Sequence, residues 1–210
     1  MQALKEHGIL KGYFGTLVHD CWAPYWKLDC EHALCGAHLL RELLYVQEST
    51  RQAWSQGLMD TLQAANMACH VARQNDQATL SPEQIEAFTN RYQTLVKEGQ
   101  GQNLATVKTP VQRGRAKQST SYNLLLRLHE REAQVLRFMH DPRVSFTNNL
   151  AERAIRMPKV KQKISDCFRT LVGAQNFCLI RSYLDTARKQ GVGMLAAICV
   201  LWAAYGFCLG

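Results

Sequence analysis

The stretch around which the chain is organised reads Ser145-Phe-Thr-Asn-Asn-Leu-Ala-Glu-Arg-Ala-Ile-Arg-Met-Pro-Lys-Val-Lys-Gln-Lys-Ile-Ser165. One carboxylate, Glu152, heads a run of cations, and these are Arg153, Arg156, Lys159, Lys161, Lys163 and, shortly after the stretch, Arg169. If Asn149 caps a helix here, Glu152 is its third residue, the usual position of a capping-box carboxylate. The alternative is functional, because a carboxylate can hold a divalent metal while neighbouring cations hold a phosphodiester backbone.

The charge of the chain is unevenly distributed. Residues 1–110 carry nine Lys and Arg against eleven Asp and Glu, whereas residues 111–210 carry sixteen against six, out of a formal net charge of +8. This asymmetry predicts an anionic partner for the second half, most often nucleic acid. A basic face that is only solvated is the alternative. An apolar fraction of 47% and a charged fraction of 20% exclude a disordered chain and fit a soluble globular protein.

Cysteine usage indicates a reducing compartment. The chain holds eight cysteines, but its first residues, Met1-Gln-Ala-Leu-Lys-Glu-His7, are polar and do not form a signal peptide. Cys69, Cys178 and Cys199 lie in apolar, helical surroundings, where a free cysteine acts as a small hydrophobic residue. We therefore expect a cytoplasmic protein, associated with the nucleoid when it binds DNA.

A short apolar stretch near the start predicts a buried strand. Tyr13–His19 is β-branched and aromatic, and it delivers Asp20 at its carboxyl end. In open α/β sheets, active sites collect at that edge. The aromatic loop Cys21–Trp26 follows, and its rings could stack on unpaired bases. Packing beneath the end of the strand is the interpretation that we favour.

The middle of the chain predicts helices. Apolar periodicity and end signals place them at Glu31–Glu48, Arg51–Gln74, Ser81–Gly99 and Ser119–His140. Ser81 and Gln84 have the spacing of a capping box. Residues 99–118 are polar, rich in glycine and basic toward their end, as in a flexible linker that meets a phosphate backbone.

The first of these helices raises the question of zinc. His32, Cys35 and His38 are three residues apart, and imidazole and thiolate are the usual zinc ligands. The spacing matches no common structural zinc site, so we expect Cys35 and His38 to serve packing and hydrogen bonding instead. A zinc-binding structural module remains an alternative.

Five segments, in order from about residue 10 to 191, resemble the C-terminal half of the insertion-sequence 66 transposase family. They read Val18-His-Asp-Cys-Trp-Ala-Pro-Tyr-Trp26, His32-Ala-Leu-Cys-Gly-Ala-His-Leu-Leu-Arg-Glu-Leu43, Phe146-Thr-Asn-Asn-Leu-Ala-Glu-Arg153, Met157-Pro-Lys-Val-Lys-Gln-Lys-Ile-Ser165 and Arg181-Ser-Tyr-Leu-Asp-Thr-Ala-Arg-Lys-Gln-Gly191.

This resemblance implies a DDE transposase with an RNase H-like core. Two aspartates and a glutamate in that family bind two divalent metals, normally Mg²⁺ and otherwise Mn²⁺, that activate water or a 3′-hydroxyl for attack on DNA phosphodiesters. By motif, Asp20 matches the second aspartate and Glu152 the glutamate. Cys35 and His38 resemble a Cys-x-x-His element, and Asn148 and Asn149 belong to the glutamate motif, for which we expect a structural role.

The expected fold is mainly α with a small α/β part, a truncated RNase H-like core that carries a helical insertion. Its expected regions are remnant strands with the second aspartate in residues 1–30, the helical insertion in 31–140, the glutamate helix with its DNA-contacting basic segment in 141–191, and an apolar tail in 192–210. The implied partners are transposon ends and target DNA, with further copies of the chain in an oligomeric transposition complex.

The sequence also departs from the family pattern. No aspartate in residues 1–19 matches the family's first catalytic aspartate, so we expect the chain to be incomplete and inactive alone. A non-catalytic DNA-binding or subunit-interacting remnant is the alternative. Ala154 and Asp166 stand where Asp and Gly are expected. Val192–Gly210 carries no charge, and we interpret it as a core-packing helix or a frameshifted tail rather than a membrane span.

Overall fold

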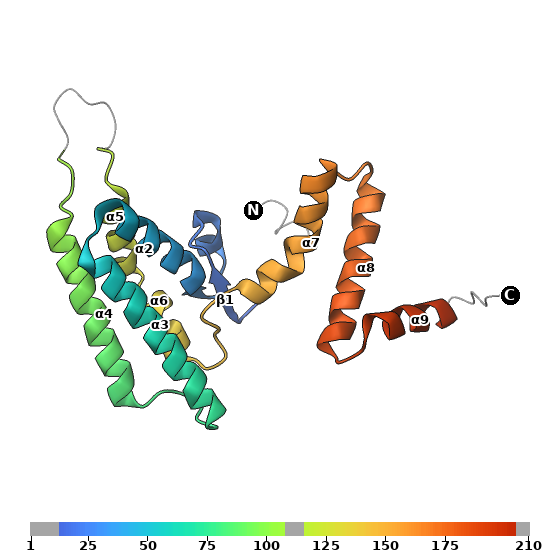
Figure 1. The fold of residues 1–210 in the computed structure, drawn as a ribbon, viewed down its shortest axis with the longest axis horizontal. Coiled ribbons are helices and arrows are strands. Elements are labelled where there is room, and N and C mark those ends of the chain that lie inside the picture. Colours follow the sequence, from blue (N-terminus) through green and yellow to red (C-terminus); the bar gives the residue numbers. More distant parts are fainter. Residues whose placement is uncertain (1–12, 108–115, 205–210) are drawn as a thin grey trace. The chain divides into compact units, whose positions relative to one another are not determined.

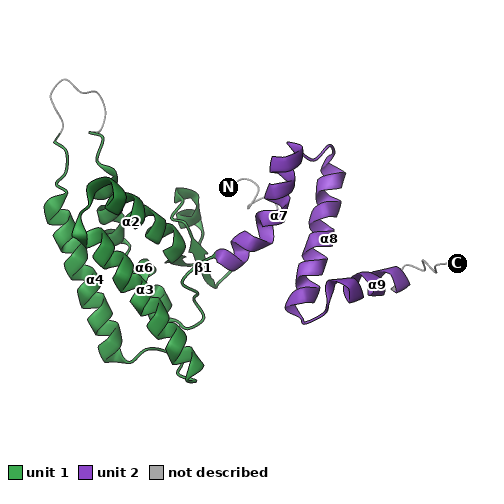
Figure 2. Cartoon of the chain, in the orientation of Figure 1, with its two compact units in different colours: residues 1–148 green, residues 149–210 purple. Residues whose placement is uncertain are grey.

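The chain forms two compact units, residues 1–148 and 149–210 (Figure 2). The structure is a computed structural model that describes residues 13–107 and 116–204. Residues 1–12 of the first predicted region, 108–115 of the predicted linker and 205–210 of the predicted tail lie outside the described residues. Unit 1 contains the first two regions expected from the sequence together with residues 141–148.

Most of the described residues are helical, with one small parallel sheet (Figure 1). The elements of unit 1 are β1 (Thr16–His19), η1 (Ala23–Lys27), β2 (Glu31–Leu34), α2 (Gly36–Thr50), α3 (Ala53–Gln74), α4 (Pro82–Gln102), α5 (Thr120–Glu130) and α6 (Glu132–His140). Those of unit 2 are α7 (Asn149–Ser165), α8 (Leu171–Lys189) and α9 (Met194–Ala204). The expectation of a mainly α chain with a small α/β part is confirmed.

The sheet consists of β1 and β2, which run parallel with Thr16 opposite Glu31 and His19 opposite Leu34. The backbone N–H of Cys35 continues this pairing by donating to His19 O at 2.9 Å. The prediction that the first helix begins at Glu31 is therefore wrong for its first five residues, Glu31–Leu34 in β2 and the extended Cys35. Pairing with β1 satisfies the backbone of this segment, and the helix begins only at Gly36.

Five helices of unit 1 bury its hydrophobic core. The largest side chains without solvent contact include Leu43, Trp54, Leu58, Tyr92 and Leu128. The Tyr92 hydroxyl donates to Leu128 O at 2.9 Å, so the ring joins α4 to α5 without leaving a polar atom unpaired. These helices fall within residues 31–140, for which the sequence predicts a helical insertion, and their place in an RNase H-like core stays a prediction.

Two expected helix ends differ from the structure. The Ser81 and Gln84 capping box is present, but α4 continues past Gly99 to Gln102. A Cβ on Gly99 would lie 2.6 Å from Leu125 and 2.9 Å from Trp54, so this glycine permits close packing and does not end the helix. The helix expected over Ser119–His140 is two helices, α5 and α6, which meet at Arg131, where the backbone leaves helical geometry.

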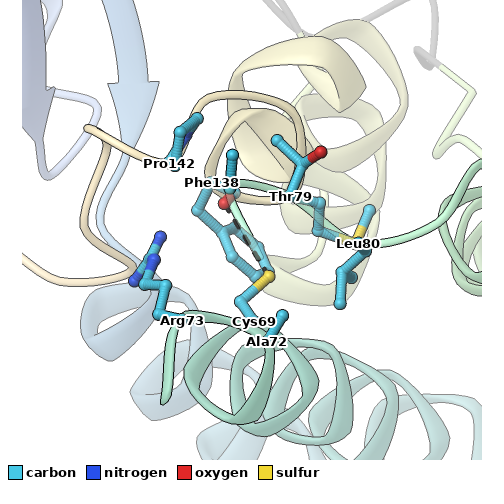
Figure 3. Close-up of a pocket in the computed structure, with 9 residues that line it drawn as sticks. Cys69, Ala72, Arg73, Thr79, Leu80, Phe138 and Pro142 are labelled. Atoms are coloured by element: carbon cyan, nitrogen blue, oxygen red, sulfur yellow. Dashed lines mark hydrogen bonds between the residues drawn. The ribbon is translucent and has the colours of Figure 1, made fainter. Parts of the chain in front are cut away.

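Cys69 lies in the core, where α3 faces α6 (Figure 3). Its thiol lies 3.8 Å from Phe138 O, and burial raises the pKa of the thiol. The expected role as a small hydrophobic residue is confirmed for Cys69. It is wrong for Cys178 and Cys199, which are exposed on unit 2. Apolar neighbours in sequence predict burial only where a helix has a partner to pack against.

The described part of unit 2, residues 149–204, forms three helices with little core of its own. Its fully buried side chains among the described residues are Ala187 and Ala197, and the Tyr183 hydroxyl donates to Ala197 O at 3.0 Å to join α8 to α9. Pro158 lies inside α7 and does not end it, although the two halves of the helix run in different directions in Figure 1. Within residues 13–107 and 116–204, no helix is long and apolar enough to span a membrane.

Candidate active-site carboxylate and basic helix

Asp20 occupies the position that the sequence predicts, directly after β1, and its side chain is exposed. Its Oδ1 accepts a hydrogen bond from the backbone N–H of Trp22 at 3.1 Å. Cys21, between them, has a φ of 69°, in the left-handed region that non-glycine residues rarely adopt. The carboxylate therefore stands on a tight, defined turn and not on a continuous strand.

A chain of hydrogen bonds through two histidines holds this turn. His32 Nε2 lies 3.2 Å from Leu28 O, a carbonyl that can only accept, so Nε2 carries the proton and Nδ1 accepts. His19 Nε2, 3.1 Å from His32 Nδ1, is then the donor. His19 Nδ1 in turn accepts from the backbone N–H of Cys21 at 3.1 Å. Every ring nitrogen has a partner when both imidazoles are neutral.

Burial favours the neutral form of His19. The side chain is 2% exposed, and burial lowers the pKa of His19 to about 4, with the nearby His32 adding to this effect and Asp20 opposing it. The hydrogen-bond chain therefore persists at neutral pH. Sequence reasoning missed this pair, because it assigned His32 to a helix. The sequence does contain one signal for this pair, because a histidine, His19, stands immediately before Asp20.

Aromatic rings pack around the same histidine. The rings of Tyr25 and Trp26 lie 5.1 and 4.9 Å from that of His19, and the Arg131 guanidinium lies 4.1 Å from the centre of the Trp26 ring. The packing role expected for the aromatic loop therefore holds for Tyr25 and Trp26. Trp22 differs, since 53% of it is exposed.

Cys35 and Asn148 form a second contact near the sheet. The buried Cys35 thiol donates to Asn148 Oδ1 at 3.0 Å, and the Asn148 backbone N–H approaches Cys35 Sγ at 3.4 Å. Beside them the Gly36 N–H donates to Phe146 O at 2.7 Å. These bonds fasten the segment just before α7 to the start of α2. His38 is half-buried, and its backbone N–H donates to Cys35 O at 3.1 Å.

Glu152 lies in the first turn of α7, where the helix dipole favours a carboxylate. The same helix carries five exposed cations, which are Arg153, Arg156, Lys159, Lys161 and Lys163. Arg156, Lys159 and Lys163 follow Glu152 at intervals of four, seven and eleven residues, which places all four along one side of the helix. Arg169 is exposed just beyond α7. The helix begins at Asn149, so Asn149 is its first residue and not a cap outside it.

Asp20 belongs to unit 1 and Glu152 to unit 2. In the part of the chain that the structure describes, no three His, Cys, Asp or Glu side chains form a group that could hold a metal ion. Both candidate residues carry carboxylates, the ligands that Mg²⁺ prefers in proteins.

The comparisons with known proteins agree with these motifs. The family model described as Transposase IS66 family matches residues 2–176. No curated protein and no solved structure matches the chain. The matched range contains Asp20, the histidine pair and all of α7, and transposase membership indicates DNA as the partner. Because the match covers most of the sequence, the chain belongs to the Transposase IS66 family.

Proposed function

We propose that this chain supplies two carboxylates and a DNA-binding helix to a DDE transposase with an RNase H-like core. The observation that carries the proposal is α7, where Glu152 and five exposed cations share one helix of 17 residues. Asp20, at the carboxyl end of β1, is the second carboxylate. The family match supports transposition as the process that these residues serve.

The cations of α7 suit a phosphodiester backbone. Five Lys and Arg against one Glu give the helix a net charge of +4, and it has no fully buried residue. Cations that neutralise phosphates release counterions, so binding weakens steeply as salt rises, with a slope of about 0.9 per contact on duplex DNA. These side chains would position the DNA without reading its sequence.

Asp20 and Glu152 would hold Mg²⁺ or Mn²⁺, which in transposases makes water or a 3′-hydroxyl a nucleophile at neutral pH. The turn after β1 presents Asp20 to solvent with one oxygen already bonded to the Trp22 N–H. Glu152 stands among cations that would hold the DNA near it. We expect the 210 residues alone not to cut DNA, because the family resemblance calls for a third carboxylate.

DNA binding is the first test. Titration of a labelled duplex at several salt concentrations should show that Arg156→Gln/Lys159→Gln/Lys163→Gln lowers the salt slope by about 2 to 3 units. Arg188→Gln/Lys189→Gln is the matched control, because both cations lie on α8 of the same unit and pair with Asp185. Equal losses in the two variants would contradict a specific role for α7.

Nicking of DNA with Mg²⁺ or Mn²⁺ is the second test, with Glu152→Gln and Asp20→Asn beside the unaltered chain. No cleavage with retained binding is the expected result, and it would assign a non-catalytic DNA-binding role to this chain by itself. Cleavage that both variants abolish would show that a working site assembles from these residues, with a third carboxylate drawn from elsewhere in the chain or from another copy.

A further inference from the structure

Trp22 carries an exposed indole on the turn that presents Asp20. It is 53% exposed, while Tyr25 and Trp26 of the same loop are half-buried against His19. Its backbone N–H donates to Asp20 Oδ1 at 3.1 Å. This hydrogen bond ties the candidate carboxylate to the backbone of the residue that carries the exposed ring.

The orientation of this indole is defined before any ligand arrives. The Trp22 and Tyr25 rings meet edge to face, with 5.5 Å between centres and an interplanar angle of 76°. Tyr25 in turn lies against His19, whose two nitrogens are both bonded. A large aromatic side chain held in place while half of it faces solvent loses little conformational entropy when it binds.

The charges around the loop favour a base over a phosphate. Asp20, Asp29 and Glu31 are exposed carboxylates here, and they are matched by three cations, Lys27, Arg131 and the Arg137 that pairs with Glu31. Without an excess of positive charge, the loop lacks the attraction that a phosphate needs. Stacking between an indole and a nucleobase needs no opposite charge, because every base has a π-face.

We propose that Trp22 is a stacking platform for an unpaired DNA base beside Asp20. The base must be outside a duplex stack, as in a single strand or a flipped nucleotide, because both faces of a base inside a duplex are covered by stacked neighbours. The inference rests on the proposed function, since it places a nucleotide of the DNA held by α7 next to the candidate carboxylate. The ligand class is single-stranded DNA, or a frayed or flipped nucleotide at a duplex end.

The test is a pair of equilibrium titrations of the full chain, with a single-stranded oligonucleotide and with a covalently closed circular duplex that contains the same sequence and has neither ends nor loops. Trp22→Ala should weaken binding of the single strand about tenfold and leave binding of the closed duplex unchanged. Trp22→Phe should restore most of the affinity, because a phenyl ring still stacks. Tyr45→Ala, which removes another exposed aromatic residue of unit 1, is the matched control and should change neither affinity.

Two further readouts separate stacking from a general loss of structure. Single-stranded DNA should quench the tryptophan emission of the unaltered chain, and Trp22→Phe should remove most of that quenching while it still binds. The salt slope should be the same in Trp22→Ala as in the unaltered chain, because stacking releases no counterions. Equal affinity of Trp22→Ala for the single strand, or equal losses for both DNAs, would overturn the inference and leave the α7 proposal standing. Absence of binding to either DNA by the unaltered chain would overturn both.

Discussion

His19 Nε2 donates a hydrogen bond to His32 Nδ1 at 3.1 Å, and this bond joins the last residue of β1 to the second residue of β2, next to the turn that carries Asp20. The remaining nitrogens bond to the Cys21 N–H and to Leu28 O. A proton added to either ring would leave two donors facing one another. The candidate carboxylate therefore stands on a support that is complete only when both imidazoles are neutral.

The stability of unit 1 should depend on pH through His19. The pKa of His19 is about 4 in the folded chain, against 6.5 for an unperturbed histidine. Between these values the unfolded chain binds the extra proton, so stability is complete above about pH 6.5 and falls as the pH drops toward 4. Denaturant unfolding should show a loss of up to about 3 kcal/mol across this window. His19→Asn should flatten this dependence, whereas the exposed His140→Asn should retain it; identical pH profiles for the three proteins would contradict the assignment.

Replacement of Gly36 should destabilise the junction of β2 and α2. A Cβ at this position would lie 2.2 Å from the Phe146 ring. We expect Gly36→Ala to cost about 1 to 3 kcal/mol in urea unfolding, and Phe146→Leu to recover part of that loss when the two are combined. Gly101→Ala is the control, since nothing lies within 4 Å of its Cβ, and it should be neutral or stabilising. A neutral Gly36→Ala would mean that the ring can move aside freely.

Substitutions of Cys35 and Asn148 should have coupled effects on the free energy of unfolding. Each single substitution, Cys35→Ala or Asn148→Ala, removes one partner of the 3.0 Å bond between thiol and amide. The expected cost is about 1 to 2 kcal/mol for each, because the remaining polar group loses its partner. The double variant should lose less than the sum of the single losses. Strict additivity in a denaturation cycle would show that the contact carries no coupling energy.

Replacement of Asp166 by glycine should stabilise the last turn of α7. This residue directly follows α7 and has a φ of 54°, a left-handed conformation that is more favourable for glycine than for other residues. It also places a carboxylate next to the carboxyl end of α7, the negative end of the helix dipole. Asp166→Gly should slow hydrogen exchange in the last turn of α7 by about fivefold, equivalent to about 1 kcal/mol. Asp166→Ala removes the charge but keeps the strain, so it should recover less of this gain; a larger gain for alanine would disprove the backbone explanation.

The sequence by itself determined the features that depend on local chemistry. The capping box of Ser81 and Gln84, the helix end before Pro142 and the helix that carries Glu152 all follow from neighbouring residues, whose side chains satisfy or interrupt a few backbone groups. The carboxyl end of β1 at Asp20 was also predictable, because a short β-branched stretch stops there. Long motifs were sufficient to indicate the family.

Only the tertiary structure decided the features that depend on a distant partner. Glu31–Leu34 forms a strand because its backbone pairs with that of β1. The periodicity of the local sequence does not predict such a pairing. Gly99 stayed inside α4 because Trp54 and Leu125 pack against its bare Cα. The bond between His19 and His32, and the division of one aromatic loop into packed rings and an exposed Trp22, likewise arise only when β1, β2 and α6 lie together. Several conformations are acceptable to the local sequence, and contacts with distant residues determine which one forms. The contacts that hold Asp20 in place are of this long-range kind.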